Sequence, residues 1–282
     1  MAEARGFSLL ERFELKYHIP VEWADRIGAF LAPYCEEDYY SKITPGGFYW
    51  ITNLYLDSPT WTFLGWKKKQ LLDRFNMRIR TYGEHPAQEG TFHFECKRKI
   101  KNICYKSRGT VKGINPGEVW HMKPEDWPCK GEKDRKYVKD FLYKTELYNA
   151  HPRLLTQYKR RAWFGLREEY SRVTIDTGMR FREENGFDYT VDPHYMHSTG
   201  IPRFFQPGCD AMLELKCPCS QVPYWMFDLI KFLNLKHAAF SKFGNAAAEW
   251  KRVYENPRRF KTPYWTKLGL PIEENLLNRE CV

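Results

Sequence analysis

Most of the chain consists of short stretches in which hydrophobic and polar residues alternate. The run from Arg12 to Ile19 is the clearest, because every odd position is apolar and every even position is Arg, Glu, Lys or His. Successive side chains of a strand point to opposite faces, so this period predicts a strand with one charged and one apolar face. The same period predicts further strands over residues 50–56, 76–82, 91–99, 103–108, 155–162, 170–177 and 211–216.

Between these strands, apolar residues at helical spacing predict helices over residues 20–34, 57–72, 132–149, 223–235 and 241–255. The second of these has a start signal, Asp57-Ser58-Pro59, in which a capping residue precedes a proline of the first turn. No change of composition marks a domain boundary. We therefore expect one α+β domain over residues 1–256, with antiparallel strands covered by helices, and an irregular tail over residues 257–282.

The polar faces of the predicted strands carry a repeated charge pattern. Three strands contain Glu-x-Lys (Glu14/Lys16, Glu95/Lys97 and Glu214/Lys216), and two contain paired cations (Arg78/Arg80 and Lys106/Arg108). One interpretation is a sandwich whose charged faces meet water. Like charges on neighbouring strands destabilise a sheet, however. The other interpretation is therefore a barrel whose charged faces point inward, around an anion and a metal, while helices cover the outward apolar faces.

Composition narrows the class of protein. The 282 residues include 45 Lys+Arg and 35 Asp+Glu, which gives a formal net charge of +10, and 17% are aromatic. The aromatic content excludes global disorder. No run approaches the ~18 apolar residues of a membrane span, and we expect no signal peptide, because the first residues contain no apolar stretch. The positive charge favours an anionic partner, whether nucleic acid, an acidic membrane surface or a phosphate compound.

Several familiar sites are not supported by the sequence. It contains no GxxxxGK[ST] motif, no strand–GxGxxG–helix unit, and no Ser-His-Asp or Cys-His signal of a covalent nucleophile. His93 and His151 have no second ligand at a metal-binding spacing, so we expect them to be structural. The run 67–69, three lysines on a predicted helix, is interpreted as a solvated face, with docking of an anionic polymer or of an acidic membrane surface as the alternative.

A series of short motifs then carries a resemblance to a known family. In order they read Arg12-Phe13-Glu14-Leu15-Lys16-Tyr17, Tyr55-Leu56-Asp57-Ser58, Arg78-Ile79-Arg80-x-Tyr82, Phe94-Glu95-Cys96-Lys97, Tyr158-x-Arg160, Arg172-Val173-Thr174-Ile175-Asp176, Leu213-Glu214-Leu215-Lys216 and Phe240-Ser241-Lys242-Phe243. This ordered set resembles the polyphosphate polymerase domain of the vacuolar transporter chaperone (VTC) complex. That domain is a branch of the CYTH-like triphosphate tunnel metalloenzymes. The resemblance covers residues 11–244 and is closest to a short, stand-alone, bacterial type of the domain.

The resemblance implies an antiparallel β-barrel tunnel with surrounding helices. It also implies transfer of the ATP γ-phosphate onto a growing inorganic polyphosphate chain, with Mn²⁺ or Mg²⁺ as cofactor. By position, the residues that match the family's basic tunnel lining are Lys16, Arg78, Arg80, Lys97 and Lys106. Tyr158, Arg160 and Arg172 match its phosphate-binding Tyr-x-Arg and following Arg. Glu214 matches its metal-binding carboxylate, and Ser241 and Lys242 match the Ser-Lys near the tunnel mouth.

The chemistry of phosphoryl transfer assigns roles to these groups. Arginine makes planar two-point contacts with phosphate, so Arg78, Arg80, Arg160 and Arg172 are the expected clamps. Additional positive charge would come from Lys16, Lys97, Lys106, Lys216 and Lys242. Glu214 would hold the metal, with Glu14, Glu95 and Asp176 as secondary candidates whose rival role is to orient neighbouring cations by ion pairing. Tyr158 would bind phosphate or pack against the barrel wall.

One position departs from the family pattern. Where the fungal proteins have a lysine two residues before the serine of the Ser-Lys pair, this chain has Ala239. Lys236 and His237 are the nearby groups that we considered as substitutes. Which group contacts phosphate at this end of the tunnel is therefore left open by the sequence.

Two other functions remain as alternatives. The first is a tunnel triphosphatase that hydrolyses tripolyphosphate or nucleoside triphosphate. Such enzymes carry Glu-x-Glu-x-Lys in the first strand, whereas this chain has Arg12, Glu14 and Lys16, which weakly favours transfer. The second is a non-enzymatic module that binds polyphosphate or RNA. Aromatic residues oppose the charges on these strands, so nucleic acid is the least supported partner. We expect a cytoplasmic protein, or one peripheral at the inner face of the membrane, with a membrane-protein partner that receives the polymer.

Overall fold

The computed structural model describes residues 12–101, 103–198, 208–219 and 221–254. The strands are β1 (Arg12–Ile19), β2 (Cys35–Glu37), β3 (Tyr49–Asp57), β4 (Asp73–Tyr82), β5 (Thr91–Ile100), β6 (Ile103–Lys112), β7 (His151–Gly165), β8 (Arg172–Glu183), β9 (His197–Ser198) and β10 (Ala211–Pro218). The helices are α1 (Trp23–Leu31), α2 (Tyr39–Ile43), α3 (Thr62–Lys68), α4 (Glu132–Tyr148), α5 (Tyr224–Phe232) and α6 (Lys242–Tyr254). Short 3₁₀ turns are η1 (Pro45–Gly47), η2 (Pro116–His121), η3 (Pro124–Asp126) and η4 (Pro193–Tyr195).

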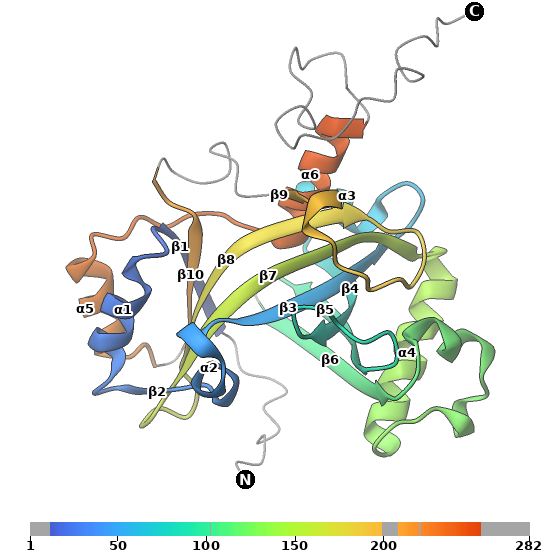
Figure 1. Ribbon diagram of the computed structural model, residues 1–282, viewed down its shortest axis with the longest axis horizontal. Coiled ribbons are helices and arrows are strands. Elements are labelled where there is room, and N and C mark those ends of the chain that lie inside the picture. The colour runs from blue at the N-terminus through green and yellow to red at the C-terminus, as the bar shows by residue number, and fades with distance from the viewer. Residues whose placement is uncertain (1–11, 102, 199–207, 220, 255–282) are drawn as a thin grey trace, which may run out of the picture.

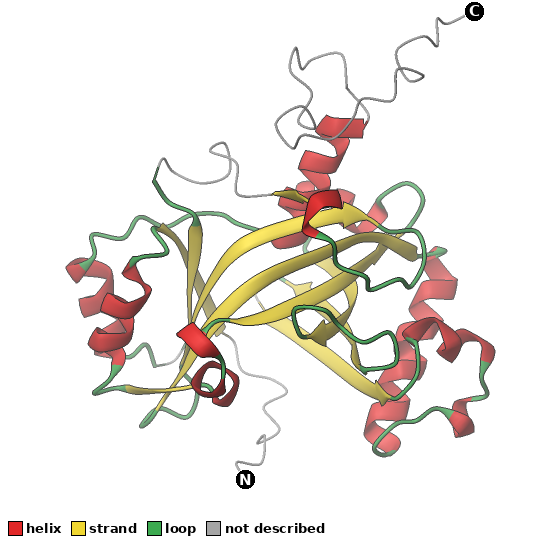
Figure 2. Ribbon diagram, in the orientation of Figure 1, coloured by secondary structure: helices red, strands yellow, loops and turns green. Residues whose placement is uncertain are grey.

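The strands form one antiparallel sheet in the order β1-β10-β8-β7-β3-β4-β5-β6. The short strand β2 pairs with β7, and β9 pairs with β8. All eight predicted strands are present, most of them longer than predicted, and the α+β class with an antiparallel sheet is confirmed. Figure 2 shows the sheet with helices around it.

The sheet curls strongly (Figure 1). Strand pairing runs from β1 at one edge to β6 at the other, and within the described residues these two edge strands do not pair with each other. The predicted barrel is therefore present as a curled sheet with an opening between β1 and β6. A side-chain contact spans that opening, because Lys97 Nζ of β5 lies 2.7 Å from Glu14 Oε1 of β1. One ion pair therefore links the inner faces of β1 and β5 across the opening.

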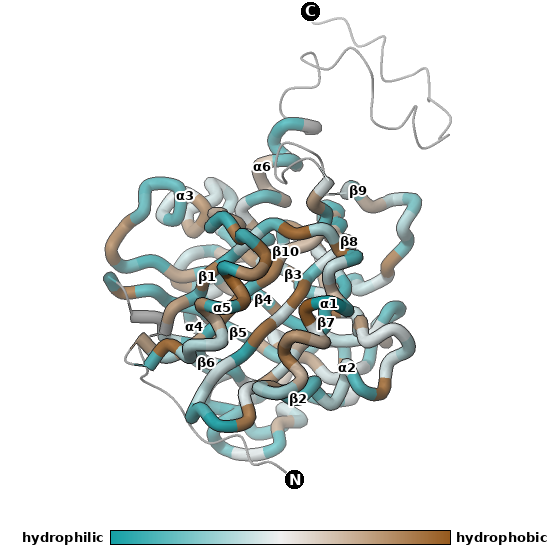
Figure 3. The backbone as a smooth tube through the Cα atoms, turned by 90° about the vertical axis from the view of Figure 1, so that its left-hand side faces the viewer, coloured by the Kyte–Doolittle hydropathy of each residue, from teal (hydrophilic) through white to brown (hydrophobic). Residues whose placement is uncertain are grey.

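The outward faces of the strands are apolar and are covered by helices, as predicted. On β4–β6, Ile79, Phe92 and Phe94 pack in one core cluster with Val138 and Phe141 of α4. A second cluster joins β1, β8 and β10 to α1 and α5. Figure 3 looks onto this second layer, with α1 and α5 in front of the strands. Because the apolar side chains are used outward, the alternating period leaves the charged ones for the inside.

Gly109 of β6 lets α4 lie close to the sheet edge. A Cβ added at this residue would lie 2.5 Å from the backbone oxygen of Asp134 and 2.7 Å from Val138 Cγ2, both in α4. Only a residue without a side chain fits this approach. The contact sets the first turns of α4 beside the end of β6.

The helix predicted from Asp57-Ser58-Pro59 forms, but α3 begins later than expected. The buried Asp57 carboxylate accepts hydrogen bonds from the backbone N–H groups of Phe63 (2.9 Å) and Leu64 (3.0 Å). These are free donors of the first helical turn, so Asp57 caps the helix from beyond an intervening turn and moves its start to Thr62. Through this capping, the end of β3 fixes where α3 directs its lysines.

Other differences from the predictions are local. Pattern analysis missed β2 and α2, which are too short to show a period, and the predicted helix at 20–34 is shortened to α1. In the part of the chain that the structure describes, no helix is long and apolar enough to cross a bilayer. The predicted tail over residues 257–282 lies outside the described residues.

Candidate functional site

Glu95 lies at the centre of a cluster of cations on strands β4–β6. Arg78, Glu95 and Arg108 are direct neighbours across the three strands. Arg78 approaches Oε2 of Glu95 to 2.6 Å, and Arg108 and Lys106 approach Oε1 to 2.5 Å and 2.7 Å. Burial alone would raise the pKa of Glu95, but the guanidinium charges of Arg78 and its neighbours outweigh burial and hold this pKa well below its usual range. One carboxylate thus positions three cations without neutralising them all.

Arg80 is buried with only neutral partners. Its side chain donates from Nε to Asn53 Oδ1 (2.9 Å) and from Nη2 to the Tyr158 hydroxyl (3.4 Å), and the residue is 6% exposed. Among the residues that the structure describes, no carboxylate lies within 4.0 Å of this guanidinium. The charge of Arg80 contributes to the lowered pKa of Glu95, so the two groups interact without contact. A buried guanidinium that has no ion pair of its own leaves room for an added anion.

Asp176 of β8 holds a second group of cations. Arg160 of β7 makes two contacts with the carboxylate, at 2.6 and 2.8 Å, and Lys242 Nζ at the start of α6 lies 2.6 Å from Oδ2. The ammonium of Lys242 also lies 4.8 Å from the centre of the Tyr158 ring. Burial would raise the pKa of Tyr158, but Arg160 and Arg80 outweigh burial and lower this pKa to about 8. Tyr158 packs in the interior, as one of its two predicted roles requires, and its hydroxyl accepts from Arg80; its predicted contact with phosphate stays a prediction.

Glu14 and Glu214 share one lysine. Lys216 Nζ lies 3.1 Å from Glu214 and 3.9 Å from Glu14. Lys97 binds both oxygens of Glu14, at 2.7 and 2.9 Å, and Lys16 lies 3.5 Å from Glu214. Burial opposes the ionisation of Glu14, yet the charges of Lys216 and Lys97 lower its pKa to about 2. Two ionised carboxylates therefore lie on either side of a bound cation.

This pair of carboxylates fits the metal that the resemblance implies. Within the described residues, no group of three His, Cys, Asp or Glu side chains could hold an ion without other ligands. Mg²⁺ and similar hard cations, however, are commonly held by one or two carboxylates together with substrate phosphate oxygens. Glu214 and Glu14 are ionised oxygen donors that already place a cation, the Lys216 ammonium, between them. They are the residues that would hold Mn²⁺ or Mg²⁺ once phosphate is present.

Lys67 of α3 is half-buried against Ser241, and for this residue the predicted solvated face is wrong. Its ammonium contacts the Ser241 hydroxyl, whereas Lys68 and Lys69 on the same helix are exposed. No carboxylate within the described ranges lies within 4.0 Å of Lys67 Nζ. Burial, and then the nearby charges of Lys16 and Lys97, lower the pKa of Lys67 to about 7.

This contact adds a third candidate to the two groups considered as substitutes at Ala239. Lys236 and His237, the two groups considered as substitutes, are both exposed, and the His237 ring meets the edge of the Tyr17 ring. Lys67 instead reaches Ser241 from a helix far away in the sequence. The cation beside the Ser-Lys pair therefore comes from α3.

Arg172 lies apart from the other predicted clamps. Its guanidinium is 4.0 Å from Asp38, which also accepts a hydrogen bond from the Tyr49 hydroxyl (3.0 Å), and it lies 4.8 Å from the centre of the Phe164 ring. Arg172 is the first residue of β8 and the cross-strand neighbour of Lys216, and its guanidinium is directed towards Asp38, which precedes α2.

The structure thus brings most of the predicted residues onto one inner face, where cations outnumber carboxylates. Those joined by the contacts above are Lys16, Arg78, Arg80, Lys97, Lys106, Tyr158, Arg160, Lys216, Ser241 and Lys242, with Glu14, Glu95, Asp176 and Glu214. Sequence reasoning did not assign Arg108, Asn53 or Lys67 to the site. Arg108 carried a usable signal, since it shares a face with Lys106. Lys67 was marked only as part of the run 67–69, and Asn53 carried no signal.

Comparisons with known proteins give one family match. The model of the VTC domain matches residues 11–251. A comparison with curated proteins finds no significant match. Similar solved structures include a candidate adenylate cyclase from Bacillus halodurans (13% identity, 91% of this chain and 100% of that chain, TM-score 0.46). A candidate adenylyl cyclase from Hippeastrum, reported to have a dominant triphosphatase activity, has 13% identity over 84% of this chain and 95% of that chain, with a TM-score of 0.43. These two values are too low to assign an activity.

Proposed function

The chain belongs to the VTC domain family, and from this premise we propose that it is a metal-dependent polyphosphate polymerase that transfers the γ-phosphate of ATP onto inorganic polyphosphate. The observation that carries the proposal is the cationic inner face, above all the buried Arg80 without a carboxylate partner in the described chain. Cations follow one another along several strands, which suits an anion that is itself linear and repeatedly charged.

The proposed reaction needs little covalent chemistry from the protein. A terminal oxygen of the acceptor chain attacks the γ-phosphorus, the bond from that phosphorus to the β–γ bridging oxygen breaks, and ADP leaves with that oxygen. The acceptor oxygen is already an anion, so no general base is needed. Arg78, Arg80 and Arg108 would hold the phosphates in line and offset the charge that the transfer spreads over them.

The metal would act together with these cations. When bound to Glu214 and Glu14, Mn²⁺ or Mg²⁺ supplies Lewis-acid stabilisation of phosphate oxygens. Lys216, which now bridges the two carboxylates, would turn its ammonium towards the incoming phosphates. Lys16 and Lys97 would keep the carboxylates oriented through the contacts that they already make.

The test is incubation of the purified protein with ATP and Mn²⁺, followed by analysis of long-chain polyphosphate, ADP and free phosphate. Polymer with ADP supports the proposal. ADP and phosphate without polymer would identify a triphosphatase, and no turnover would leave a polyanion-binding module. Arg80→Ala and Glu214→Gln should each abolish polymer formation. Arg98→Ala is the matched control, because Arg98 pairs with Asp73 on the outer side of β5 with both side chains half exposed. Normal synthesis by Arg80→Ala would refute the site assignment.

The resemblance adds a place in the cell to the proposal. We propose that the protein is cytoplasmic or peripheral at the inner face of the membrane, and that a membrane-protein partner receives the polymer. Its support is the analogy with the fungal complex. Fractionation of cells that express a tagged chain tests the peripheral location, and complete recovery in the soluble fraction at low salt would count against it.

A further inference from the structure

A cavity of about 570 Å³ lies at the end of β4–β6 that is farther from Lys97. Its lining includes Tyr82 of β4, His93 of β5, Thr110 of β6 and Tyr40 of α2. The charged residues Lys112, Lys130 and Asp134 also line it. The volume is in the range of pockets that hold small ligands. The cavity is therefore large enough to hold a small ligand.

The cavity continues directly into the cationic inner face. Tyr82 follows Arg80 by two residues on β4, and Thr110 follows Arg108 by two residues on β6. Residues two apart on a strand share a face and lie about 7 Å apart. A ligand in the cavity can therefore extend a charged group into the space between Arg80 and Arg108 without leaving the surface of the sheet.

The part of the cavity nearest the strands is aromatic. The rings of Tyr40 and Tyr82 are nearly parallel, with centres 5.8 Å apart and 6° between their planes, and Tyr40 is 49% exposed. The His93 ring meets the edge of Tyr82 at 5.8 Å and contacts the Thr110 hydroxyl through Nδ1 (3.0 Å). Burial, and then the charge of Arg108, lower the pKa of His93 to about 4, so this ring is neutral near pH 7.

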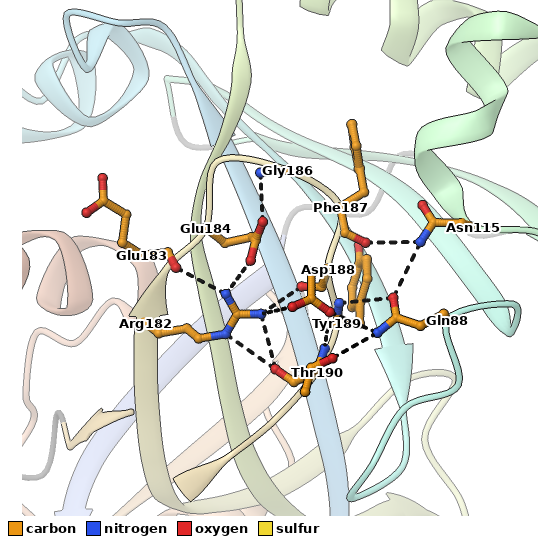
Figure 4. Close-up of polar contacts among 10 residues, drawn as sticks. All are labelled: Gln88, Asn115, Arg182, Glu183, Glu184, Gly186, Phe187, Asp188, Tyr189 and Thr190. Atoms are coloured by element: carbon orange, nitrogen blue, oxygen red, sulfur yellow. Dashed lines mark hydrogen bonds and ion pairs between the residues drawn. The ribbon is translucent and has the colours of Figure 1, made fainter. Parts of the chain in front are cut away.

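The loop between β4 and β5, which contributes Ala87 and Gly90 to the lining, is held in place by a polar network (Figure 4). Gln88 donates to Asp188 (2.9 Å) and Thr190 (3.2 Å) and accepts from the backbone N–H of Tyr189 (3.3 Å). Asn115 also donates to Gln88 (3.4 Å). Contacts from two distant segments thus fix this wall before any ligand arrives, which lowers the cost of binding.

We infer that this cavity binds the nucleoside of a nucleoside triphosphate, with the base against the tyrosine rings and the phosphates directed between Arg80 and Arg108. The aromatic wall suits any base, because every base has a face that can stack on a ring. An inorganic phosphate chain has no group that would use such a wall. The inference rests on the proposed function only in taking a triphosphate as the ligand of the adjacent cations.

The test compares two ligands that share a triphosphate and differ in the nucleoside. Calorimetric titration with the imido analogue of ATP and with inorganic tripolyphosphate, both in Mg²⁺, gives the two dissociation constants for each variant. Tyr82→Ala should weaken binding of the ATP analogue by roughly tenfold to a hundredfold and leave tripolyphosphate within about twofold. Ala87→Trp narrows the cavity from its exposed loop without removing any packing, and it should discriminate in the same way.

Tyr39→Ala is the matched control, because Tyr39 is 66% exposed and neighbours Tyr40 but does not line the cavity. Its two dissociation constants should match those of the wild type. The nucleoside inference alone would be overturned if Tyr82→Ala and Ala87→Trp weakened binding of the ATP analogue and of tripolyphosphate by the same factor. It would also be overturned if neither variant changed the dissociation constant of the ATP analogue. Failure of the wild-type protein to bind either ligand would overturn the proposed function as well.

Discussion

The two ends of the inner face differ in chemistry although the same strands build them. At one end of β5 and β6 the inward side chains are His93 and Thr110, beside the tyrosines of the cavity. At the other end they are Lys97 and Lys106, with Lys67 of α3 close by. The first end offers rings and neutral polar groups bordered by Lys112, Lys130 and Asp134, and the second offers ammonium groups with few acids.

This difference gives the inner face a direction. A nucleoside triphosphate has one aromatic end and one anionic end, so it matches the order of groups along β5 and β6. An inorganic chain matches only the lysine end. The comparison therefore predicts that changes at the lysine end affect all phosphate ligands, whereas changes at the cavity end affect nucleotides alone.

The largest effect should come from Glu95, which lies between the two ends. Glu95→Gln leaves the cations Arg78, Lys106 and Arg108 without their shared carboxylate. Breaking a buried ion pair from one side is strongly destabilising, so we expect a loss of about 3 kcal/mol in the free energy of unfolding, measured by urea denaturation at pH 7. Tripolyphosphate should restore part of this loss, because it supplies the missing negative charge.

The control for this substitution is Asp73→Asn. Asp73 pairs with Arg98 on the outer side of the neighbouring strands, with both side chains about half exposed. Such a pair contributes little, and we expect less than about 1 kcal/mol. Equal losses for the two variants would mean that the inner cluster is no more buried in solution than the surface, and the comparison of the two ends would lose its basis.

The strand pattern and the interior charges were predictable from sequence because they share one period. Each strand buries an apolar face against helices, and the alternation then fixes where Arg78, Glu95 and Lys97 must point. The alternation depends only on neighbours two residues apart, so it groups these charges without knowledge of the tertiary structure. It left open whether the charged faces meet water or point inward, and Arg80 and Glu214 were assigned to the site by the resemblance to the VTC domain.

Lys67 and the cavity could not be found in this way. Three consecutive lysines on a helix give no period, and the inward one is chosen by the start of α3, which Asp57 sets through bonds to Phe63 and Leu64. The cavity depends on Tyr40, whose short helix is placed by contacts with distant strands, such as the Tyr40–Tyr82 stack. Long-range contacts decide both features, and the local pattern does not contain them.

The second prediction concerns Lys67→Met, measured with long-chain polyphosphate, whose internal phosphates stay ionised from pH 6.5 to 8.5. We expect roughly tenfold weaker binding at pH 6.5. An anion favours the charged lysine, so wild-type affinity should fall as the pH rises above about 7. The difference in polyphosphate affinity between the wild type and Lys67→Met should therefore be smaller at pH 8.5 than at pH 6.5. The charged groups around Lys67 are Lys16 and Glu14 of β1, Arg74 of β4 and Lys97 of β5.

The stability of the folded chain should rise with pH, whereas its affinity for polyphosphate should fall. The pKa of Lys67 is lower in the folded than in the unfolded chain, so its charge costs stability below about pH 7, and the cost disappears as the pH rises towards the unfolded value of 10.5. Lys67→Met should raise the melting temperature at pH 6.5 and raise it less at pH 9. Lys68→Met changes the exposed neighbour of Lys67. It should leave the dissociation constant for polyphosphate within about twofold of the wild-type value and the melting temperature within about one degree. Identical behaviour of the two variants would place Lys67 outside the interior.

The smallest expected effect is a ratio that stays constant. The pKa of His93 is about 4, so this ring of the cavity end stays neutral from pH 6 to pH 8, whereas Lys67 at the lysine end loses charge. The affinity of the ATP analogue and that of tripolyphosphate should therefore both change over this range, since both place phosphates among the lysines. Each affinity is first corrected for the ionisation of the ligand's own terminal phosphate, which is measured on the free ligand. The corrected ratio should then stay within about twofold, because the His93 ring beside the nucleoside does not titrate. A corrected ratio that changes tenfold would mean that an ionising group contacts the nucleoside. In that case the two ends would not be chemically separate, and the direction assigned to the inner face would be wrong.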